Sequence, residues 1–107
     1  MEQIHIYLCC RGGLSSGFLS QRARQYIKKN KIFATIDAIS ESEVQHYFSK
    51  MDILMIGPHM EYRLDSLTEQ AKAYHFPIII IPGEIYEMLD GEGLVKLALE
   101  KVNTNKV

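Results

Sequence analysis

The two cysteines of this 107-residue chain are adjacent, in the segment YLCCRGGLSSGFLS over residues 7–20. A cysteine thiolate is a strong nucleophile, and the small residues that follow are typical of a loop leading from a strand into a helix. Gly12 and Gly13 let backbone amides approach a ligand closely, and Ser15 or Ser16 can cap the helix. The unpaired N–H groups and positive end of such a helix attract an anion, most naturally phosphate. The segment therefore predicts a thiol beside a phosphate-binding loop.

Charge is distributed unevenly along the chain, in a way that favours an anion at this loop. From residue 3 to residue 36 there is no Asp or Glu, whereas six of the twelve Lys and Arg residues fall there. We interpret this front third as free of negative charge because an anion must approach it, with an ordinary solvated helix face as the alternative. The formal net charge of −1 argues against a general nucleic-acid binder.

The alternation of side chains along a strand predicts different surroundings for the two cysteines. We expect Cys9 to be a small buried residue with a raised pKa. We expect Cys10 to lie at the mouth of the loop, where the helix N-terminus would lower the pKa of its thiol and make it alkylate rapidly near neutral pH. The alternative is a tight turn in which both cysteines are merely buried apolar residues.

Short apolar segments alternate with segments of helical periodicity. The sequence predicts strands over 4–9, 32–39, 52–57 and 76–82, and helices over 17–29, 40–50, 61–75, 83–89 and 93–102. The later strands show little alternation, which indicates a parallel sheet buried on both faces. We expect one α/β domain over residues 1–107, an open four-stranded parallel sheet, doubly wound, with helices on both faces. In such sheets ligands bind beyond the carboxyl ends of the strands.

Other chemistries of cysteine fit the sequence less well. There is no C-x-x-C pair, and adjacent thiols without a suitably spaced His or Cys do not make a zinc site, so we expect no metal and no cofactor. A low-molecular-weight tyrosine phosphatase has a Cys, five residues and then an Arg. Here that sixth position is Ser15 or Ser16, and no Asp-Pro dipeptide supplies a general acid. The phosphatase-like loop after the first strand thus lacks two parts needed for hydrolysis.

Three segments in order resemble the IIB component of the lactose/cellobiose (N,N′-diacetylchitobiose) class of the bacterial phosphoenolpyruvate-dependent sugar phosphotransferase system. HIYLCCRGGLSSGFL resembles that family's strand and Cys-x-x-Gly-Met-Ser-Thr loop, through Cys10, Gly13, Leu14, Ser15 and Ser16. DILMIGPHMEYRL resembles its Gly-Pro-x-x-x-Tyr segment, through Gly57, Pro58 and Tyr62. IPGEIYEMLDGEGLVKLALE resembles its closing stretch. Arg11, Leu14 and Gly17 depart from the residues usual in the family.

The resemblance implies a phosphocarrier and phosphotransferase whose nucleophile is Cys10. It implies that Cys10 takes a phosphoryl group from a phosphohistidine of a IIA partner and passes it to a sugar entering through the membrane component IIC, such as cellobiose, lactose or chitobiose. The implied phosphate-binding loop comprises Arg11, Gly12, Gly13, Leu14, Ser15 and Ser16. A phosphatase-like hydrolase and a non-catalytic anion-binding module are the alternatives.

Two residues outside the loop are weaker candidates. His59 follows the third strand and could help bind phosphate or meet the donor histidine, although an exposed loop histidine without a role is the simpler interpretation. Tyr86 lies after the fourth strand, where a partner could contact it. No apolar run reaches 18 residues and the N-terminus lacks the basic region of a signal peptide, so we expect a cytoplasmic protein without membrane insertion.

Overall fold

Four parallel strands form one sheet in the computed structural model, which describes residues 3–10 and 14–105, without the side chains of 14–15 and 104–105. The strands are β1 (Ile4–Cys10), β2 (Ala34–Ser40), β3 (Ile53–Ile56) and β4 (Ile78–Ile80), and their order across the sheet is β2-β1-β3-β4. All neighbouring pairs are parallel. The expected four-stranded parallel fold is confirmed.

The helices differ in detail from the predicted ones. They are α1 (Leu14–Lys29), α2 (Leu64–Gln70), α3 (Gly83–Glu87) and α4 (Gly91–Asn105), with 3₁₀ helices over Val44–Lys50, Pro58–Arg63 and Lys72–Tyr74. The helix predicted over 40–50 is therefore a shorter 3₁₀ helix, and the one predicted over 61–75 is three consecutive pieces. The Asp90 carboxylate accepts a hydrogen bond from the Gly93 N–H at 3.0 Å, which stabilises the start of α4 two residues earlier than predicted.

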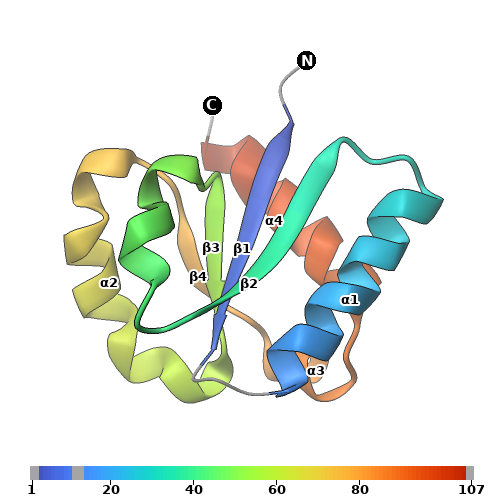
Figure 1. The fold of residues 1–107 in the computed structure, drawn as a ribbon, viewed down its shortest axis with the longest axis horizontal. Helices are drawn as coiled ribbons and strands as arrows, with labels where there is room; N and C mark the ends of the chain where they lie inside the picture. Colours follow the sequence, from blue (N-terminus) through green and yellow to red (C-terminus); the bar gives the residue numbers. More distant parts are fainter. Residues whose placement is uncertain (1–2, 11–13, 106–107) are drawn as a thin grey trace.

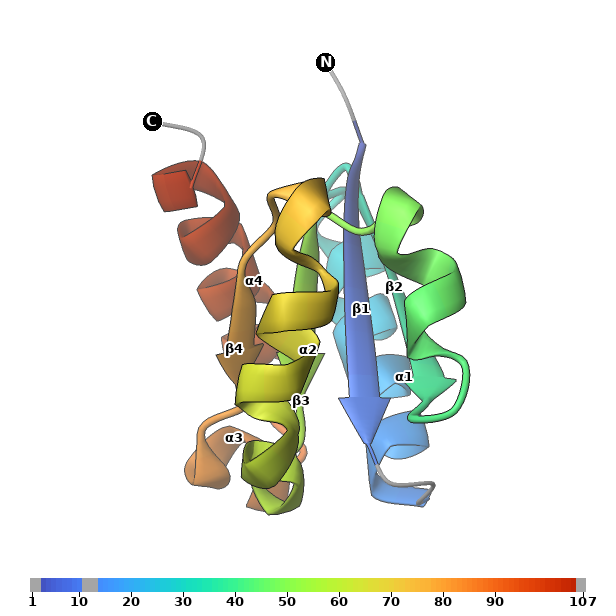
Figure 2. The same cartoon turned by 90° about the vertical axis from the view of Figure 1, so that its left-hand side faces the viewer.

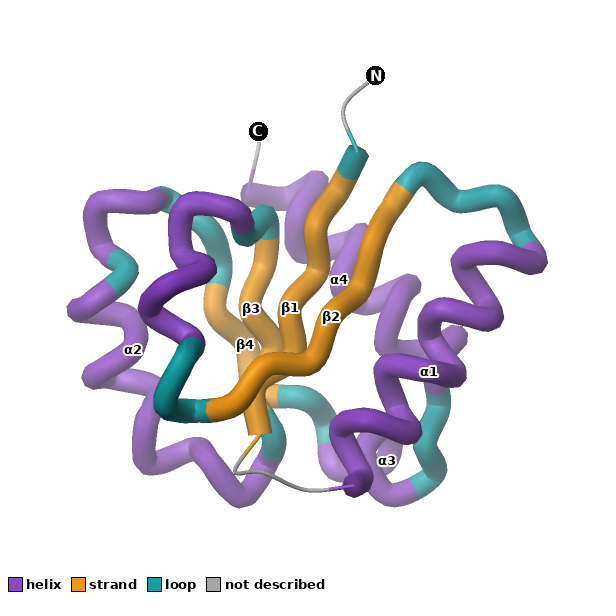
Figure 3. Tube along the Cα trace, viewed as in Figure 1, coloured by secondary structure: helices purple, strands orange, loops and turns teal. Residues whose placement is uncertain are grey.

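Helices cover both faces of the sheet, as Figures 1 and 3 show. One hydrophobic core joins the sheet to α1 and α4 and includes Ile6, Leu8, Leu19, Ala23, Leu94 and Val95. The other joins the opposite face to the Val44–Lys50 helix and α2 and includes Tyr7, Cys9, Phe48, Met60 and Leu67. Consecutive residues of β1 alternate between the two cores, which is the period of two that a strand imposes.

The candidate residue Cys10 lies at the carboxyl edge of the sheet. From β1 the chain passes through α1 to β2 on one side, and then crosses to β3 on the other side of β1. The loops after β1 and β3 therefore diverge, which is where doubly wound sheets bind ligands. Figures 1 and 2 show that the start of α1 and the short helix α3 lie at this same end.

Candidate functional site

Cys10 is the last residue of β1 and pairs with Ser40 of β2. Its neighbour Cys9 is completely buried, with 0% of its surface exposed, in the core between the sheet and α2. Cys10 is outside both hydrophobic cores and is 2% exposed. Both thiols are free. The prediction that the two cysteines have different surroundings is confirmed, and Cys10 is the one at the edge of the sheet.

Three hydrogen-bond donors from three parts of the chain converge on the Cys10 sulfur. They are the Ser16 hydroxyl in the first turn of α1, the Tyr86 hydroxyl in α3, and the backbone N–H of Gly57 after β3, which also donates to the Cys9 carbonyl oxygen at 3.0 Å. Ser16 is itself buried, at 8% exposed. Each of these donors stabilises a negative charge on sulfur and so acts to lower the pKa of the thiol. This arrangement of donors can stabilise negative charge on the sulfur or on a group bound to it.

The pKa of Cys10 is nevertheless raised from its ordinary value, which corrects the expected lowering. The largest cause is burial, because removing the thiolate from water costs more than the three hydrogen bonds return. Rapid alkylation near neutral pH is therefore no longer expected for a thiol that is both buried and protonated. Near neutral pH the raised pKa keeps the Cys10 thiol protonated, with hydrogen-bond donors around it.

Cys9 behaves as predicted. Burial raises its pKa to about 12, with smaller contributions from Cys10 and Glu41 and an opposing one from Arg63. A thiol with this pKa is almost entirely protonated at neutral pH, and none of the surface of Cys9 is exposed in the folded protein. Cys9 is thus a packing residue of the core.

Gly57 permits close approach of two side chains at the site. Its φ of −63° and ψ of 151° are ordinary extended angles, so the backbone conformation does not require glycine. A Cβ here would lie 2.7 Å from His59 Cε1 and 3.1 Å from both His59 Nδ1 and Cys10 Sγ. The imidazole and the thiol therefore approach the same point in space, and any larger residue would push one of them away.

His59 also contacts Tyr86. The centroids of the two rings are 5.6 Å apart, with an angle of 57° between the ring planes. This tilted arrangement is a favourable one for aromatic rings. Cys10 at the end of β1, His59 in the helix after β3 and Tyr86 in the helix after β4 thus lie close together.

The structure brings together some of the residues predicted from the sequence and leaves others undescribed. Cys10, Ser16 and His59 lie together. Arg11, Gly12 and Gly13 lie outside the described residues, as do the side chains of Leu14 and Ser15, whose backbones begin α1. Sequence reasoning gave Tyr86 little weight for chemistry, because no local pattern links it to the first strand.

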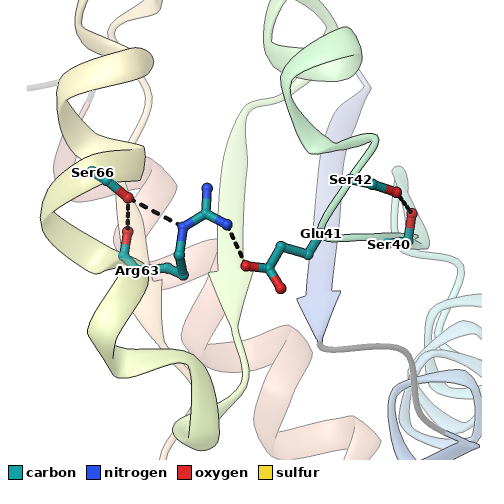
Figure 4. A network of polar contacts seen from close by, with 5 residues as sticks. All are labelled: Ser40, Glu41, Ser42, Arg63 and Ser66. Atoms are coloured by element: carbon teal, nitrogen blue, oxygen red, sulfur yellow. Dashed lines mark hydrogen bonds and ion pairs between the residues drawn. The ribbon is translucent and has the colours of Figure 1, made fainter.

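Arg63 is a cation near the site that sequence reasoning did not single out. It lies close enough to Cys9 to lower the pKa of that thiol, whereas Glu41 raises it. Figure 4 shows that the Arg63 guanidinium donates to the Glu41 carboxylate and also to the Ser66 hydroxyl, the latter at 3.2 Å. Its charge is thus already balanced, and the pair ties the end of β2 to the start of α2.

The described part of the chain has neither a metal-binding cluster nor a membrane-spanning helix. No three His, Cys, Asp or Glu side chains there are grouped so that they could hold a metal ion. Among the same residues, no helix has the length and apolar character needed to cross a bilayer.

Comparison with known protein families identifies the class to which this fold and cysteine site belong. The family model described as PTS system, Lactose/Cellobiose specific IIB subunit matches residues 5–97. The chain belongs to this family and is a IIB component of a sugar phosphotransferase system of the lactose/cellobiose type.

Individual relatives agree with this assignment. The chain is 28% identical over 94 residues to the PTS system oligo-beta-mannoside-specific EIIB component of Bacillus subtilis (strain 168), covering 88% of this chain and 91% of the relative. The solution structure of a cellobiose-specific phosphotransferase IIB component from Borrelia burgdorferi superimposes with a TM-score of 0.81 at 31% identity, covering 97% of this chain and 95% of the other. The lactose-specific IIB domain from Streptococcus pneumoniae has a TM-score of 0.85 at 13% identity, covering 94% and 98%, and shows the shared fold.

Proposed function

We propose that Cys10 carries a phosphoryl group between two partners of the phosphotransferase system. It receives the group from a phosphohistidine of a IIA protein and delivers it to a sugar transported by a membrane IIC component. The observation that supports this proposal most directly is the convergence of the Ser16, Gly57 and Tyr86 donors on a cysteine sulfur at the carboxyl edge of the sheet. Membership of the IIB family supports the choice of IIA and IIC proteins as the partners.

The first transfer balances with a neutral thiol as the starting state. The Cys10 sulfur attacks phosphorus, the P–N bond to the donor imidazole breaks, and an S–P bond forms. The thiol proton leaves with the imidazole nitrogen, which needs a proton to depart as a neutral ring. A raised pKa at Cys10 is therefore compatible with the reaction, because proton and phosphoryl group move in opposite directions between the same two residues.

The second transfer regenerates the thiol. A sugar hydroxyl oxygen attacks phosphorus, the S–P bond breaks, and sulfur leaves while the hydroxyl proton is released and restores Cys10 to its neutral form. Most of the rate enhancement of phosphoryl transfer comes from positioning the reacting groups and stabilising charge in the transition state. We assign the positioning to the backbone amides of the loop from Arg11 to Ser16.

A β-linked disaccharide or oligosaccharide is the sugar class that we propose. One relative is named oligo-beta-mannoside-specific and another cellobiose-specific, and both names denote β-linked sugars. This chain supplies the phosphoryl group, and IIC binds the sugar.

Intact-mass spectrometry with a phosphorylated IIA donor tests the proposal. We expect one added phosphoryl group on the wild-type chain and on Cys9→Ala, and none on Cys10→Ser. Modification of Cys10→Ser but not of Cys9→Ala would contradict the assignment of the nucleophile. Continuous release of inorganic phosphate would instead indicate a hydrolase, and binding of phosphate without covalent modification would indicate an anion-binding module.

A further inference from the structure

We propose that Tyr86 and His59 form a two-residue clamp that binds the phosphoryl group of phosphorylated Cys10. The inference rests on the proposed function and adds the side chains that recognise the phosphorylated state. Neither residue belongs to the loop that follows β1. They come from the segments after β4 and after β3 respectively.

The first argument is the contact of Tyr86 with the reacting atom. Its hydroxyl donates to the Cys10 sulfur in the unphosphorylated protein. When sulfur is bonded to phosphorus, the phosphoryl group brings negative charge on its three oxygens, which are stronger acceptors than the sulfur. A small rotation of the phenol brings the same O–H onto one of these oxygens, so Tyr86 keeps a partner in both states.

The second argument is the position of His59. Its Nδ1 and the Cys10 sulfur lie equally close, 3.1 Å, to the point where a Gly57 Cβ would sit. The imidazole is exposed to solvent, so it can offer an N–H to a group that projects outward from the buried sulfur. Its packing against the Tyr86 ring, at 5.6 Å between centroids, holds both side chains over the same region.

The third argument is that a phosphoryl group requires hydrogen-bond donors for its oxygens. The position that carries the phosphate-binding Arg in the tyrosine phosphatase loop is a serine here, at Ser15 or Ser16. Among the described residues near the two cysteines, Arg63 is paired with Glu41 and so cannot serve without breaking that pair. His59 is a described side chain near the sulfur that can donate an N–H to a phosphoryl oxygen.

Variants that remove only a hydroxyl or the ring nitrogens test whether Tyr86 and His59 bind the phosphoryl group or only support the local structure. Tyr86→Phe removes one hydroxyl, His59→Phe keeps an aromatic ring against Tyr86 but removes both nitrogens, and His59→Gln restores a donor. Tyr62→Phe and His46→Phe are matched controls, because Tyr62 is 59% exposed and His46 lies in the Val44–Lys50 helix that packs against the opposite face of the sheet.

The measurement is the equilibrium constant for phosphoryl transfer between phosphorylated IIA and each variant, together with the ³¹P chemical shift of the phosphocysteine. Loss of one hydrogen bond to a charged group should reduce the equilibrium constant about tenfold for Tyr86→Phe and for His59→Phe. His59→Gln should recover most of the loss. The ³¹P resonance should move in both Phe variants and stay in place in the two controls.

The outcomes distinguish failure of the clamp from failure of the proposed function. If wild-type Cys10 is phosphorylated but Tyr86→Phe and His59→Phe match the controls in both equilibrium constant and ³¹P shift, the clamp is wrong and the phosphocarrier function stands. If wild-type Cys10 accepts no phosphoryl group, both proposals are wrong. Far-ultraviolet circular dichroism of each variant shows whether a changed equilibrium arises from a folded protein.

Discussion

The burial of Cys9 predicts a specific loss of stability at alkaline pH, which Cys9→Ala should remove. In the unfolded chain this thiol ionises near its ordinary value of 9.0, whereas burial raises its pKa to about 12 in the folded protein. Above pH 9 the unfolded chain therefore binds fewer protons than the folded protein, and the free energy of unfolding falls as pH rises. The slope from this one thiol is at most about 1.4 kcal/mol per pH unit, and it ends near the folded pKa.

Replacing Cys9 by alanine should have opposite effects at the two ends of the pH range. Near pH 7 the variant loses the packing of one buried sulfur atom, a cost of about 1 kcal/mol. Above pH 9 it escapes the ionisation penalty, so the two stability curves should approach each other and cross below pH 12. Urea unfolding of both proteins at intervals from pH 7 to pH 11 measures the difference in their free energies of unfolding. The contributions of ionisable groups that both proteins share cancel in this difference.

Cys9→Ser serves as the matched control, because it has no thiol to ionise and should show the same pH-dependent difference from wild type as the alanine variant. A constant offset between wild type and Cys9→Ala across the whole range would refute the reasoning. It would mean that the Cys9 thiol ionises equally easily in the folded and unfolded chains.

Three further predictions concern close contacts and the exposure of the site. Gly91→Ala should lower the free energy of unfolding by at least about 2 kcal/mol, measured by urea unfolding, because the added Cβ would lie 2.4 Å from the backbone of α1. Gly83→Ala is the control: a Cβ at Gly83 meets open space, so this variant should change the free energy of unfolding by less than about 0.5 kcal/mol. Gly57→Ala should leave folding nearly intact but slow the phosphorylation of Cys10 by at least about tenfold in single-turnover assays with phosphorylated IIA, because the added methyl group displaces His59 or the Cys10 sulfur. An unchanged rate would show that the close approach of His59 and Cys10 is not needed for the transfer. Alkylation of Cys10 by iodoacetamide should be slow at pH 7 and rise about tenfold per pH unit up to its raised pKa, and a rate that is already maximal at pH 7 would show that the thiol is ionised there.

Local patterns in the sequence were sufficient for the arrangement of the sheet and for the separation of the two cysteines. The alternation of β1 places Cys9 in a core and leaves Cys10 at the edge, because successive side chains of any strand point to opposite faces. Apolar segments separated by helical ones were enough to predict four parallel strands, since buried parallel strands need helices on both faces. The 3₁₀ character of the Val44–Lys50 and Pro58–Arg63 helices was not predictable from periodicity, which does not distinguish short helices of the two kinds.

The sequence by itself determined the fold class, the family and the identity of the candidate nucleophile, because each depends on residue types and spacings within short segments. The tertiary structure alone decided what surrounds that nucleophile. Tyr86 meets Cys10 because the ends of β1 and of β4 face the same edge of the sheet, a relation between distant segments. It also decided the direction of the Cys10 pKa shift, because burial depends on how all the neighbouring elements pack, whereas the opposing effect of a helix N-terminus can be read locally.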